Sequence, residues 1–141
     1  MYYLKTSASF DSAHFLAGYE GKCANIHGHR WTIEVRTEGE SLQLSGTKRG
    51  MLVDFGDLKH EVRDAADSFD HSLIYEKNTL KPSTVKALNE EKFRLIEVDF
   101  RPTAENFAYY FYRKFSEKGF RIADVTVYET PENCAVYTED K

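Results

Sequence analysis

Alternation of apolar and polar residues predicts two strands near the start of the chain. From Tyr2 to Phe10 every second residue falls on one face, and that face carries most of the apolar side chains. From Trp31 to Glu38 the alternation is sharper, so this strand is expected to be half-buried. Between them lies Asp11–Arg30, a polar, glycine-containing segment that we expect to be a long connection on which functional groups gather.

Apolar residues at helical spacing predict two helices further along. The run Met51–Phe55 indicates a short strand, and its Asp54 is well placed to cap a helix over Gly56–Ser68. A second helix is expected to begin after its N-cap, Thr103, and to end near Gly119. Each helix carries an apolar stripe that must be buried against another element.

Three more strands and one irregular segment complete the predicted pattern. Phe93–Phe100 alternates, and Ile122–Glu129 and Cys134–Tyr137 form a final pair joined by a turn over Thr130–Asn133. Asn78–Glu91 has little periodicity and is expected to be an excursion of the chain. Hairpin-like spacing at both ends favours an α+β fold, an antiparallel sheet with two helices on one face.

Composition narrows the class of protein. The 141 residues predict a single domain, 1–141, with no Gly/Ser/Pro linker. Ten Phe, nine Tyr and one Trp are too many aromatic residues for a disordered chain. The formal net charge of −4 argues against a nucleic-acid or membrane-surface binder, since both need a basic face. No run reaches the roughly 18 apolar residues of a membrane span, and no signal peptide is recognisable, so a cytoplasmic location is expected.

His27-Gly28-His29 is the clearest candidate for chemistry. In an extended segment residues two apart share a face, so the two imidazoles would lie together. Imidazole suits zinc, and a catalytic zinc takes three protein ligands and an open position. His14 is the candidate third ligand, because antiparallel pairing of the first two strands would bring it to this pair. Alone, a His-x-His pair is more often incidental.

Cys23 and the pair Asp70-His71 are candidates for proton transfer. The Cys23 thiol, four residues before His27, is either a fourth, structural metal ligand or a reactive group beside the metal. Asp70 can orient the imidazole of His71 and make it more basic, although such a pair at a helix end is often only a surface feature.

Two glutamates are candidates for binding. Glu129 ends an apolar strand, where a carboxylate can accept two parallel N–H bonds from an amidine-like ligand or simply face water. Glu105 lies at the start of the second helix, a position that favours acidic residues in any case.

Six motifs in this order resemble one family over nearly the whole chain, that of 6-pyruvoyltetrahydropterin synthase and 6-carboxytetrahydropterin synthase. They are Phe10-Asp11-Ser12-Ala13-His14, Cys23-Ala24-Asn25-Ile26-His27-Gly28-His29, Val53-Asp54-Phe55, Asp70-His71, Pro102-Thr103-Ala104-Glu105-Asn106 and Tyr128-Glu129-Thr130. The chain departs from the usual pattern after His71 and in the longer excursion over Asn78–Glu91.

The resemblance implies the tunnelling fold, a four-stranded antiparallel sheet with two helices per subunit. Three subunits would close their sheets into a barrel, and two such trimers would form a hexamer. It also implies a zinc ion held by His14, His27 and His29, and a catalytic Cys23 with Asp70 and His71 as relay partners. Glu129 would anchor a pterin ring, and Glu105 and Thr103 would help to hold that end.

The substrate implied is 7,8-dihydroneopterin triphosphate. The compact Cys-x-x-x-His-Gly-His motif favours the branch that releases acetaldehyde and triphosphate and leaves 6-carboxy-5,6,7,8-tetrahydropterin, an intermediate towards queuosine. The alternative is the biopterin branch, which eliminates triphosphate and keeps the side chain as a pyruvoyl group.

Two interpretations from other classes remain. If Cys23 and the three histidines all bind zinc, the site is closed and the protein is a structural zinc-binding module. A metal-free cysteine hydrolase that uses Cys23, His71 and Asp70 is conceivable, but it leaves the His-Gly-His pair unexplained.

Overall fold

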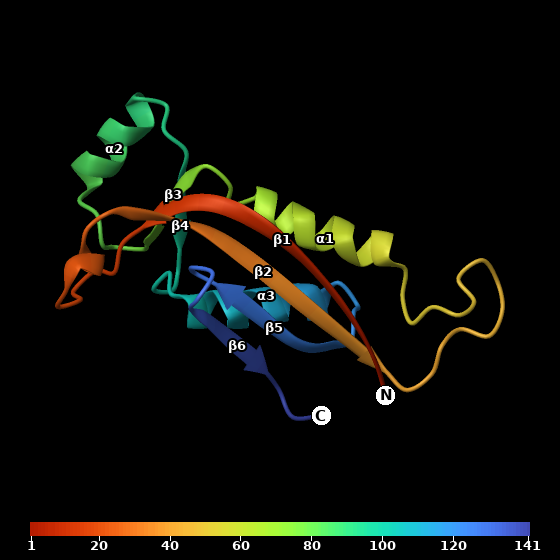
Figure 1. The fold of residues 1–141 in the computed structure, drawn as a ribbon. Helices are drawn as coiled ribbons and strands as arrows, with labels where there is room; N and C mark the ends of the chain where they lie inside the picture. Colours follow the sequence, from red (N-terminus) through yellow and green to blue (C-terminus); the bar gives the residue numbers. More distant parts are fainter.

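A curved six-stranded sheet with two long helices on one face forms the body of the protein (Figure 1). The computed structural model describes residues 1–141. The strands are β1 (Tyr2–His14), β2 (His27–Gly39), β3 (Ser72–Glu76), β4 (Leu95–Val98), β5 (Ile122–Tyr128) and β6 (Cys134–Thr138). The helices are α1 (Phe55–Asp67), α2 (Pro82–Glu90), α3 (Ala104–Glu117) and a short 3₁₀ turn, Lys22–Ala24. The strand order across the sheet is β4-β3-β1-β2-β5-β6.

The four predicted antiparallel strands are confirmed as β1, β2, β5 and β6. β1 and β2 are longer than predicted, because both continue into the polar segment that we expected to be a loop. Their register pairs Phe10 with Trp31 and, at the last rung, His14 with His27. The connection between them is therefore only Phe15–Ile26.

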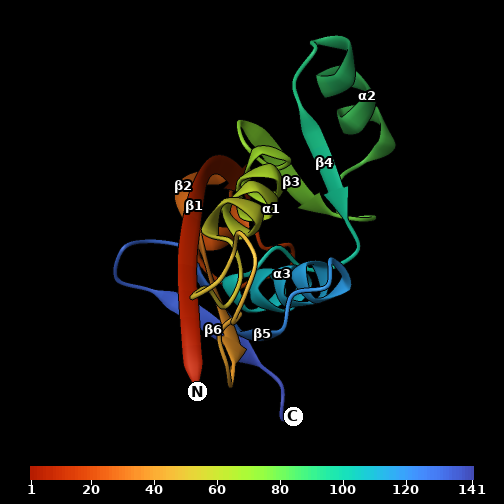
Figure 2. The same cartoon turned by 90° about the vertical axis from the view of Figure 1, so that its right-hand side faces the viewer.

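The core lies between the sheet and the helices α1 and α3, which share one side of the sheet (Figure 2). Trp31 is fully buried at its centre and contacts Phe10 and Phe107, with ring centroids 6.1 and 5.2 Å apart. Both predicted N-caps are confirmed: Asp54 accepts a bond from the N–H of Gly56, and Thr103 accepts one from the N–H of Asn106. The caps fix where both helices begin, and the buried side chains of the helices pack against the apolar face of the sheet.

The predicted strand Phe93–Phe100 is present as the shorter β4, whereas β3 and a third helix were not predicted. The sheet thus has two strands more than the four that the resemblance implies. β3 pairs in parallel with β1 through Ser12 and Ala13 alone, and β4 pairs in parallel with β3. α2 lies within the segment 78–91, for which no regular structure was predicted. None of its residues is buried, and it stands away from the two long helices (Figure 2). Its weak periodicity follows from this exposure, because a helix without a buried face needs no apolar stripe.

The predicted short strand Met51–Phe55 is wrong. These residues form the end of a loop and the first residue of α1, and no strand pairs with them. Leu52 instead contacts Gly39 at the end of β2, where a Cβ on the glycine would lie 2.3 Å from Leu52 Cδ1. The apolar run reflects this packing rather than strand pairing.

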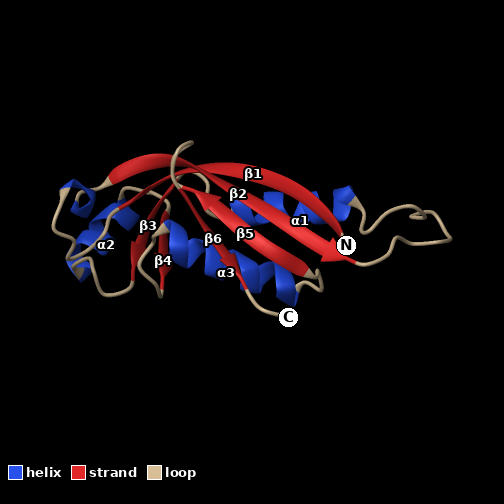
Figure 3. Cartoon of the chain, turned by 60° about the horizontal axis from the view of Figure 1, so that its bottom comes forward, coloured by secondary structure: helices blue, strands red, loops and turns tan.

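Different loops and helices lie at the two ends of the sheet (Figure 3). The chain termini and the loop between β2 and α1 lie at one end, and the β1–β2 connection and α2 lie at the other. The last rung of β1 and β2, with its histidines, belongs to the second end. None of the helices combines the length and the apolar character that crossing a membrane requires.

Candidate active site

Three histidines and one glutamate meet at the end of the β1–β2 hairpin. His14, His27 and His29 project from the paired strands, and Glu129 follows β5, the neighbour of β2. His14 Nε2 lies 3.1 Å from His27 Nε2. Glu129 Oε1 lies 3.2 Å from both His14 Nε2 and His29 Nε2. The four ligand atoms all lie within 4.8 Å of one another, so this group can bind a metal ion.

These distances fit a small tetrahedral site. Zinc–nitrogen bonds of about 2.0–2.1 Å in a tetrahedron place neighbouring ligand atoms about 3.3–3.4 Å apart. Three pairs in the group, at 3.1, 3.2 and 3.2 Å, are close to that spacing. The geometry therefore suits an ion of the size of zinc.

The tautomers of two rings direct their free nitrogen atoms to this point. His14 donates from Nδ1 to the carbonyl oxygen of Pro102 at 2.7 Å, and His27 donates from Nδ1 to that of Asn25 at 2.7 Å. In the neutral rings both Nε2 atoms then carry lone pairs that face each other. His29 Nε2 is buried and has no hydrogen-bond partner. Converging lone pairs beside a carboxylate favour a cation between them, either a proton or a metal ion, so the group has the electrostatic character of a metal site.

Burial keeps two of the histidines neutral. Loss of solvent is the main cause that lowers the pKa of His14, and it outweighs the bond to Pro102 and the attraction of Glu129. The same cause lowers the pKa of His29, with Glu129 opposing it. Trp31 lies under both rings, with centroids 5.0 and 5.6 Å away. The aromatic core thus forms the floor of the site, and neutral imidazole is the form that binds metals.

Asp70 and His71 form a pair that is attached to β1. The N–H of Asp11 donates to Asp70 Oδ1 at 2.8 Å, and the N–H of His71 donates to the carbonyl oxygen of Asp11 at 2.7 Å. Asp70 Oδ2 accepts a bond from His71 Nδ1 at 2.8 Å, which leaves Nε2 free to exchange protons. The bond from Asp11, followed by that from His71, lowers the pKa of Asp70. The structure thus supports the predicted pairing of the two side chains.

Cys23 does not contact this pair. It lies half-buried in the 3₁₀ turn, its thiol forms no hydrogen bond with Asp70 or His71, and it is not part of the His/Glu group. The predicted relay is therefore not assembled within one chain. The absence of Cys23 from the group also counts against a closed site of three histidines and a thiolate.

Thr103 and Glu105 have structural positions at the start of α3. Thr103 is the N-cap, and Glu105 lies exposed in the first turn. The adjoining Pro102 carbonyl is the acceptor for His14, so the start of α3 is joined to the metal group. Neither side chain forms a hydrogen bond with Glu129, with which the resemblance grouped them.

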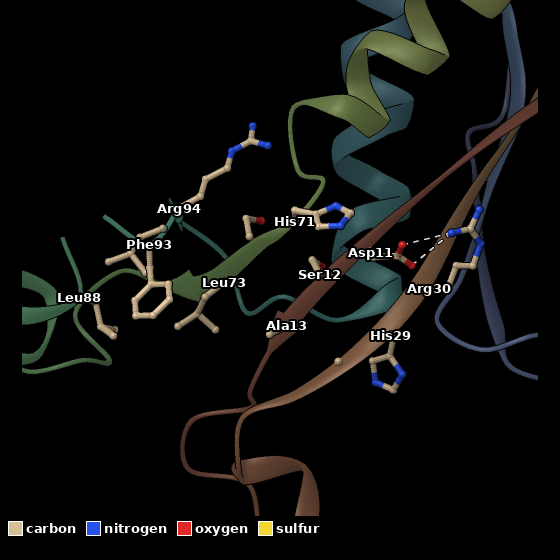
Figure 4. A pocket seen from close by; sticks show the side chains of 13 residues that line it. Asp11, Ser12, Ala13, His29, Arg30, His71, Leu73, Leu88, Phe93 and Arg94 are labelled. Atoms are coloured by element: carbon tan, nitrogen blue, oxygen red, sulfur yellow. Dashed lines mark hydrogen bonds and ion pairs between the residues drawn. The ribbon is translucent and has the colours of Figure 1, made fainter. Parts of the chain in front are cut away.

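An open cavity of about 630 Å³ extends from His29 along the end of β1 (Figure 4). One wall is polar, with His71, Asp11 and Arg30, and Arg30 forms an ion pair of 3.2 Å with Asp11. The other wall is apolar and includes Leu73, Leu88, Phe93 and Leu95. A second cavity of about 500 Å³ lies on the other side of His29 and includes Glu129. His29 thus lies between two hollows that open to solvent.

Three features of the site were not predicted. The position of Glu129 beside the histidines follows from β2–β5 pairing, which strand patterns alone do not reveal. The carbonyl groups of Pro102 and Asn25, which orient the rings, belong to the backbone and leave no residue-type signal. Arg94, which binds the turn that carries Asp70 and His71, precedes a strand that was predicted too long.

The fold and the site define an α+β protein with a histidine-rich metal-binding group at the open end of a hairpin. A family model described as 6-pyruvoyl tetrahydropterin synthase matches residues 3–140. A Haemophilus influenzae relative named 6-carboxy-5,6,7,8-tetrahydropterin synthase is 34% identical, over 99% of this chain and 100% of its own. An Archaeoglobus fulgidus relative with the same name, marked putative, is 33% identical, over 92% and 89%. This chain belongs to the 6-pyruvoyl tetrahydropterin synthase family, a family of enzymes.

Solved structures confirm the predicted α+β tunnelling fold. An uncharacterized protein from Wolinella succinogenes superposes with a TM-score of 0.83 at 20% identity, over 99% of this chain and 98% of its own. The 6-pyruvoyl tetrahydropterin synthase of Caenorhabditis elegans superposes with a TM-score of 0.68 at 26% identity, over 99% and 96%.

Proposed function

We propose that this protein converts 7,8-dihydroneopterin triphosphate to 6-carboxy-5,6,7,8-tetrahydropterin, with release of acetaldehyde and triphosphate, as a zinc-dependent lyase of the queuosine pathway. The observation that carries the proposal is the metal-binding group of His14, His27, His29 and Glu129 in a chain of this family. The relatives named 6-carboxy-5,6,7,8-tetrahydropterin synthase, similar over nearly the whole chain, support the carboxy-forming branch.

The three histidines would hold the zinc ion through their Nε2 atoms. When bound, the ion acts as a Lewis acid on the side-chain hydroxyl groups of the substrate and makes the neighbouring protons easier to remove. The backbone carbonyls of Pro102 and Asn25 keep two of the rings in the required tautomer.

Glu129 has two roles open to it, and we propose that it anchors the pterin ring. Its carboxylate can accept two parallel N–H bonds from the ring edge, and it faces the 500 Å³ cavity beside His29. Three neutral imidazoles suffice as protein ligands for a catalytic zinc, so Glu129 is free for the substrate. Glu105 and Thr103, at the start of α3, would support the same end of the ligand.

Proton transfer would fall to Cys23 and to the Asp70–His71 pair. A thiolate at Cys23 can accept a proton, and a nearby metal ion favours the thiolate. Asp70 holds the Nδ1–H of His71, so that Nε2 can receive or return a proton on the side of the large cavity. Because Cys23 and His71 do not meet within one chain, we propose that the complete site lies between subunits.

The sheet supports assembly into a homo-oligomer, a trimer or a hexamer. β1 pairs with β3 only at Ser12 and Ala13, so its edge from Tyr2 to Ser9 has no partner strand. β6 and β4 are the outer strands of the sheet, and β6 is the one on the same side of β1 as β2. Two unpaired edges on one sheet can pair between copies, which is how sheets from several subunits would close into a barrel.

The second candidate is the pyruvoyl-forming reaction, which the description of the family model favours. Both candidates are tested by incubating the purified, zinc-loaded protein with 7,8-dihydroneopterin triphosphate and identifying the products by mass. Acetaldehyde together with a carboxypterin supports the proposal, and a pyruvoylpterin selects the second candidate. No turnover of the pterin would overturn both. Full activity after removal of the metal would contradict zinc dependence.

A further inference from the structure

Arg94 binds three backbone carbonyls in the turn that carries Asp70 and His71. Its Nη1 atom donates to the carbonyl oxygen of Asp70 at 2.5 Å and to that of Asp67 at 3.3 Å. Its Nη2 atom donates to the carbonyl oxygen of Ser68 at 2.7 Å. A planar guanidinium can satisfy several acceptors at once, which no other side chain does with the same geometry.

The end of α1 has no cation of its own. The last turn of the helix contains no basic residue, although a positive charge is favourable near a helix C-terminus. The carbonyls of Asp64, Ala66 and Asp67 already accept backbone N–H groups of the turn. Arg94 supplies a cation to this end from the beginning of β4. Its own carbonyl oxygen accepts the N–H of Leu73 at 3.0 Å, so its backbone is joined to β3 directly after the turn. Arg94 is thereby held to both sides of the Asp70–His71 pair.

The turn itself has a backbone that must be held in place. His71 has φ of +53°, a left-handed conformation that is uncommon for residues other than glycine. Such conformations persist only where surrounding contacts hold them, and they gather at functional sites. On one side His71 and Asp70 are bonded to Asp11 of β1, and on the other Arg94 binds the Asp70 carbonyl.

We infer that Arg94 is a positioning residue for the Asp70–His71 pair, an inference that rests on the proposed function of that pair. Arg94 fixes the turn so that Asp70 Oδ2 accepts from His71 Nδ1 and His71 Nε2 stays free beside the large cavity. Arg94 itself touches no reacting group in this arrangement. Its effect on catalysis is transmitted through the orientation of His71.

The experiment compares Arg94→Gln, Arg94→Lys and the wild type, each loaded with zinc. Arg63→Gln is the matched control, because Arg63 is exposed on α1 and forms no ion pair or side-chain hydrogen bond. The first measurement is the ¹⁵N spectrum of the His71 imidazole, which reports the tautomer directly. We expect the wild type and Arg63→Gln to show the Nδ1–H form, and Arg94→Gln to show a mixture of both tautomers. Arg94→Lys should fall between them, since an ammonium group binds fewer carbonyls.

The second measurement is steady-state kinetics with dihydroneopterin triphosphate. We expect Arg94→Gln to lower kcat about 10-fold to 100-fold with little change in KM, because a small misplacement of a catalytic group costs about that much. Zinc content should stay at the wild-type level. In an Asp70→Asn background the same substitution should cost less than about 3-fold, since the two act through one group.

Each outcome is decisive. A wild-type His71 tautomer in Arg94→Gln would overturn the inference, and so would fully additive effects of Arg94→Gln and Asp70→Asn on kcat. If the wild type turns over no pterin, the proposed function fails, while the imidazole spectrum still supports or overturns the positioning of His71 by Arg94.

Discussion

His14 and Pro102 are joined by a buried hydrogen bond of 2.7 Å, from imidazole Nδ1 to the backbone carbonyl oxygen. The bond connects the end of β1 to the residue before the N-cap of α3, 88 positions along the chain. It serves the fold, because it satisfies a buried carbonyl, and it serves the site, because it leaves Nε2 free for a metal. His27 has the same arrangement with Asn25, but in an exposed position.

This contrast predicts different effects for His14→Ala and His27→Ala. Both variants should lose zinc, because each lacks one of three ligands. In the chelator-treated protein, His14→Ala should lower the free energy of unfolding by about 1–3 kcal/mol, because the buried Pro102 carbonyl loses its partner. His27→Ala should lower it by less than His14→Ala does, because His27 is only half-buried and its bond to Asn25 is exposed. Zinc analysis and urea unfolding measure the two effects, and equal losses of stability would contradict the assigned role of Pro102.

The two buried histidines predict a loss of stability in acid. Burial lowers the pKa of both His14 and His29 below the ordinary value of 6.5. As the pH falls through 6.5, the unfolded chain takes up protons that the folded site resists, so the unfolded state gains stability. The stability of the metal-free protein should therefore be full above this value and decrease below it.

Urea midpoints of the chelator-treated protein between about pH 7.5 and about pH 5.5 measure this dependence. His29→Gln should reduce the slope, because one of the two groups is gone. His60→Gln is the control, since the His60 side chain is 70% exposed on α1 and should leave the slope as it is. A midpoint that rises towards acid pH in the wild type would contradict the prediction.

The sequence predicted the parts of the fold in which local pattern and tertiary environment agree. Alternation in Trp31–Glu38 marks a strand with one buried face, and Asp54 and Thr103 cap helices as their residue types suggest. Prediction from the sequence failed for elements whose structure depends on their tertiary environment. β3 is a strand because it lies between β1 and β4 in parallel, and α2 is a helix without buried residues. Neither leaves a strong period in the sequence.

The site divides in the same way. His27 and His29 could be paired from their spacing alone, and His14 from the expected hairpin, because strand geometry places them on one face. The approach of Glu129 depends on the register between β2 and β5. Arg94 reaches the turn after α1 from 24 residues beyond Asp70. Contacts of this kind arise only when the sheet is assembled.

Cys23 is predicted to be needed for turnover and dispensable for folding and for zinc. Cys23→Ala should lower kcat by about 10²-fold to 10⁴-fold, the range for loss of a group that transfers a proton. It should remain folded with one zinc ion per chain, because its thiol is outside the His/Glu group. Circular dichroism, zinc analysis and kinetics check these points. Cys134→Ala, at the other free cysteine, is the matched control and should retain activity. Loss of zinc and fold in Cys23→Ala would favour a structural zinc module.

Hydrogen bonds show which residues of β1 direct their backbone groups toward its free edge. Asp11 directs both its N–H and its carbonyl oxygen away from β2, because these groups bond to Asp70 and His71. In an antiparallel strand, every second residue points the same way. Lys5 and Ser7 therefore also present their backbone groups on the outer edge, and the bond from Lys59 to the Ser7 carbonyl agrees with this.

This geometry identifies a substitution that should disrupt the proposed oligomer without unfolding the subunit. Lys5→Pro removes an outward N–H without removing any hydrogen bond between β1 and β2, and proline is tolerated at an edge of this kind. The variant should stay folded but sediment as a monomer, and it should lose activity because the complete site is proposed to lie between subunits. Lys5→Ala keeps the N–H and should remain an active oligomer, which controls for the exposed Lys5–Glu34 ion pair of 3.5 Å. Sedimentation and turnover are measured on the same samples, and a wild type that is active as a monomer would overturn the shared site.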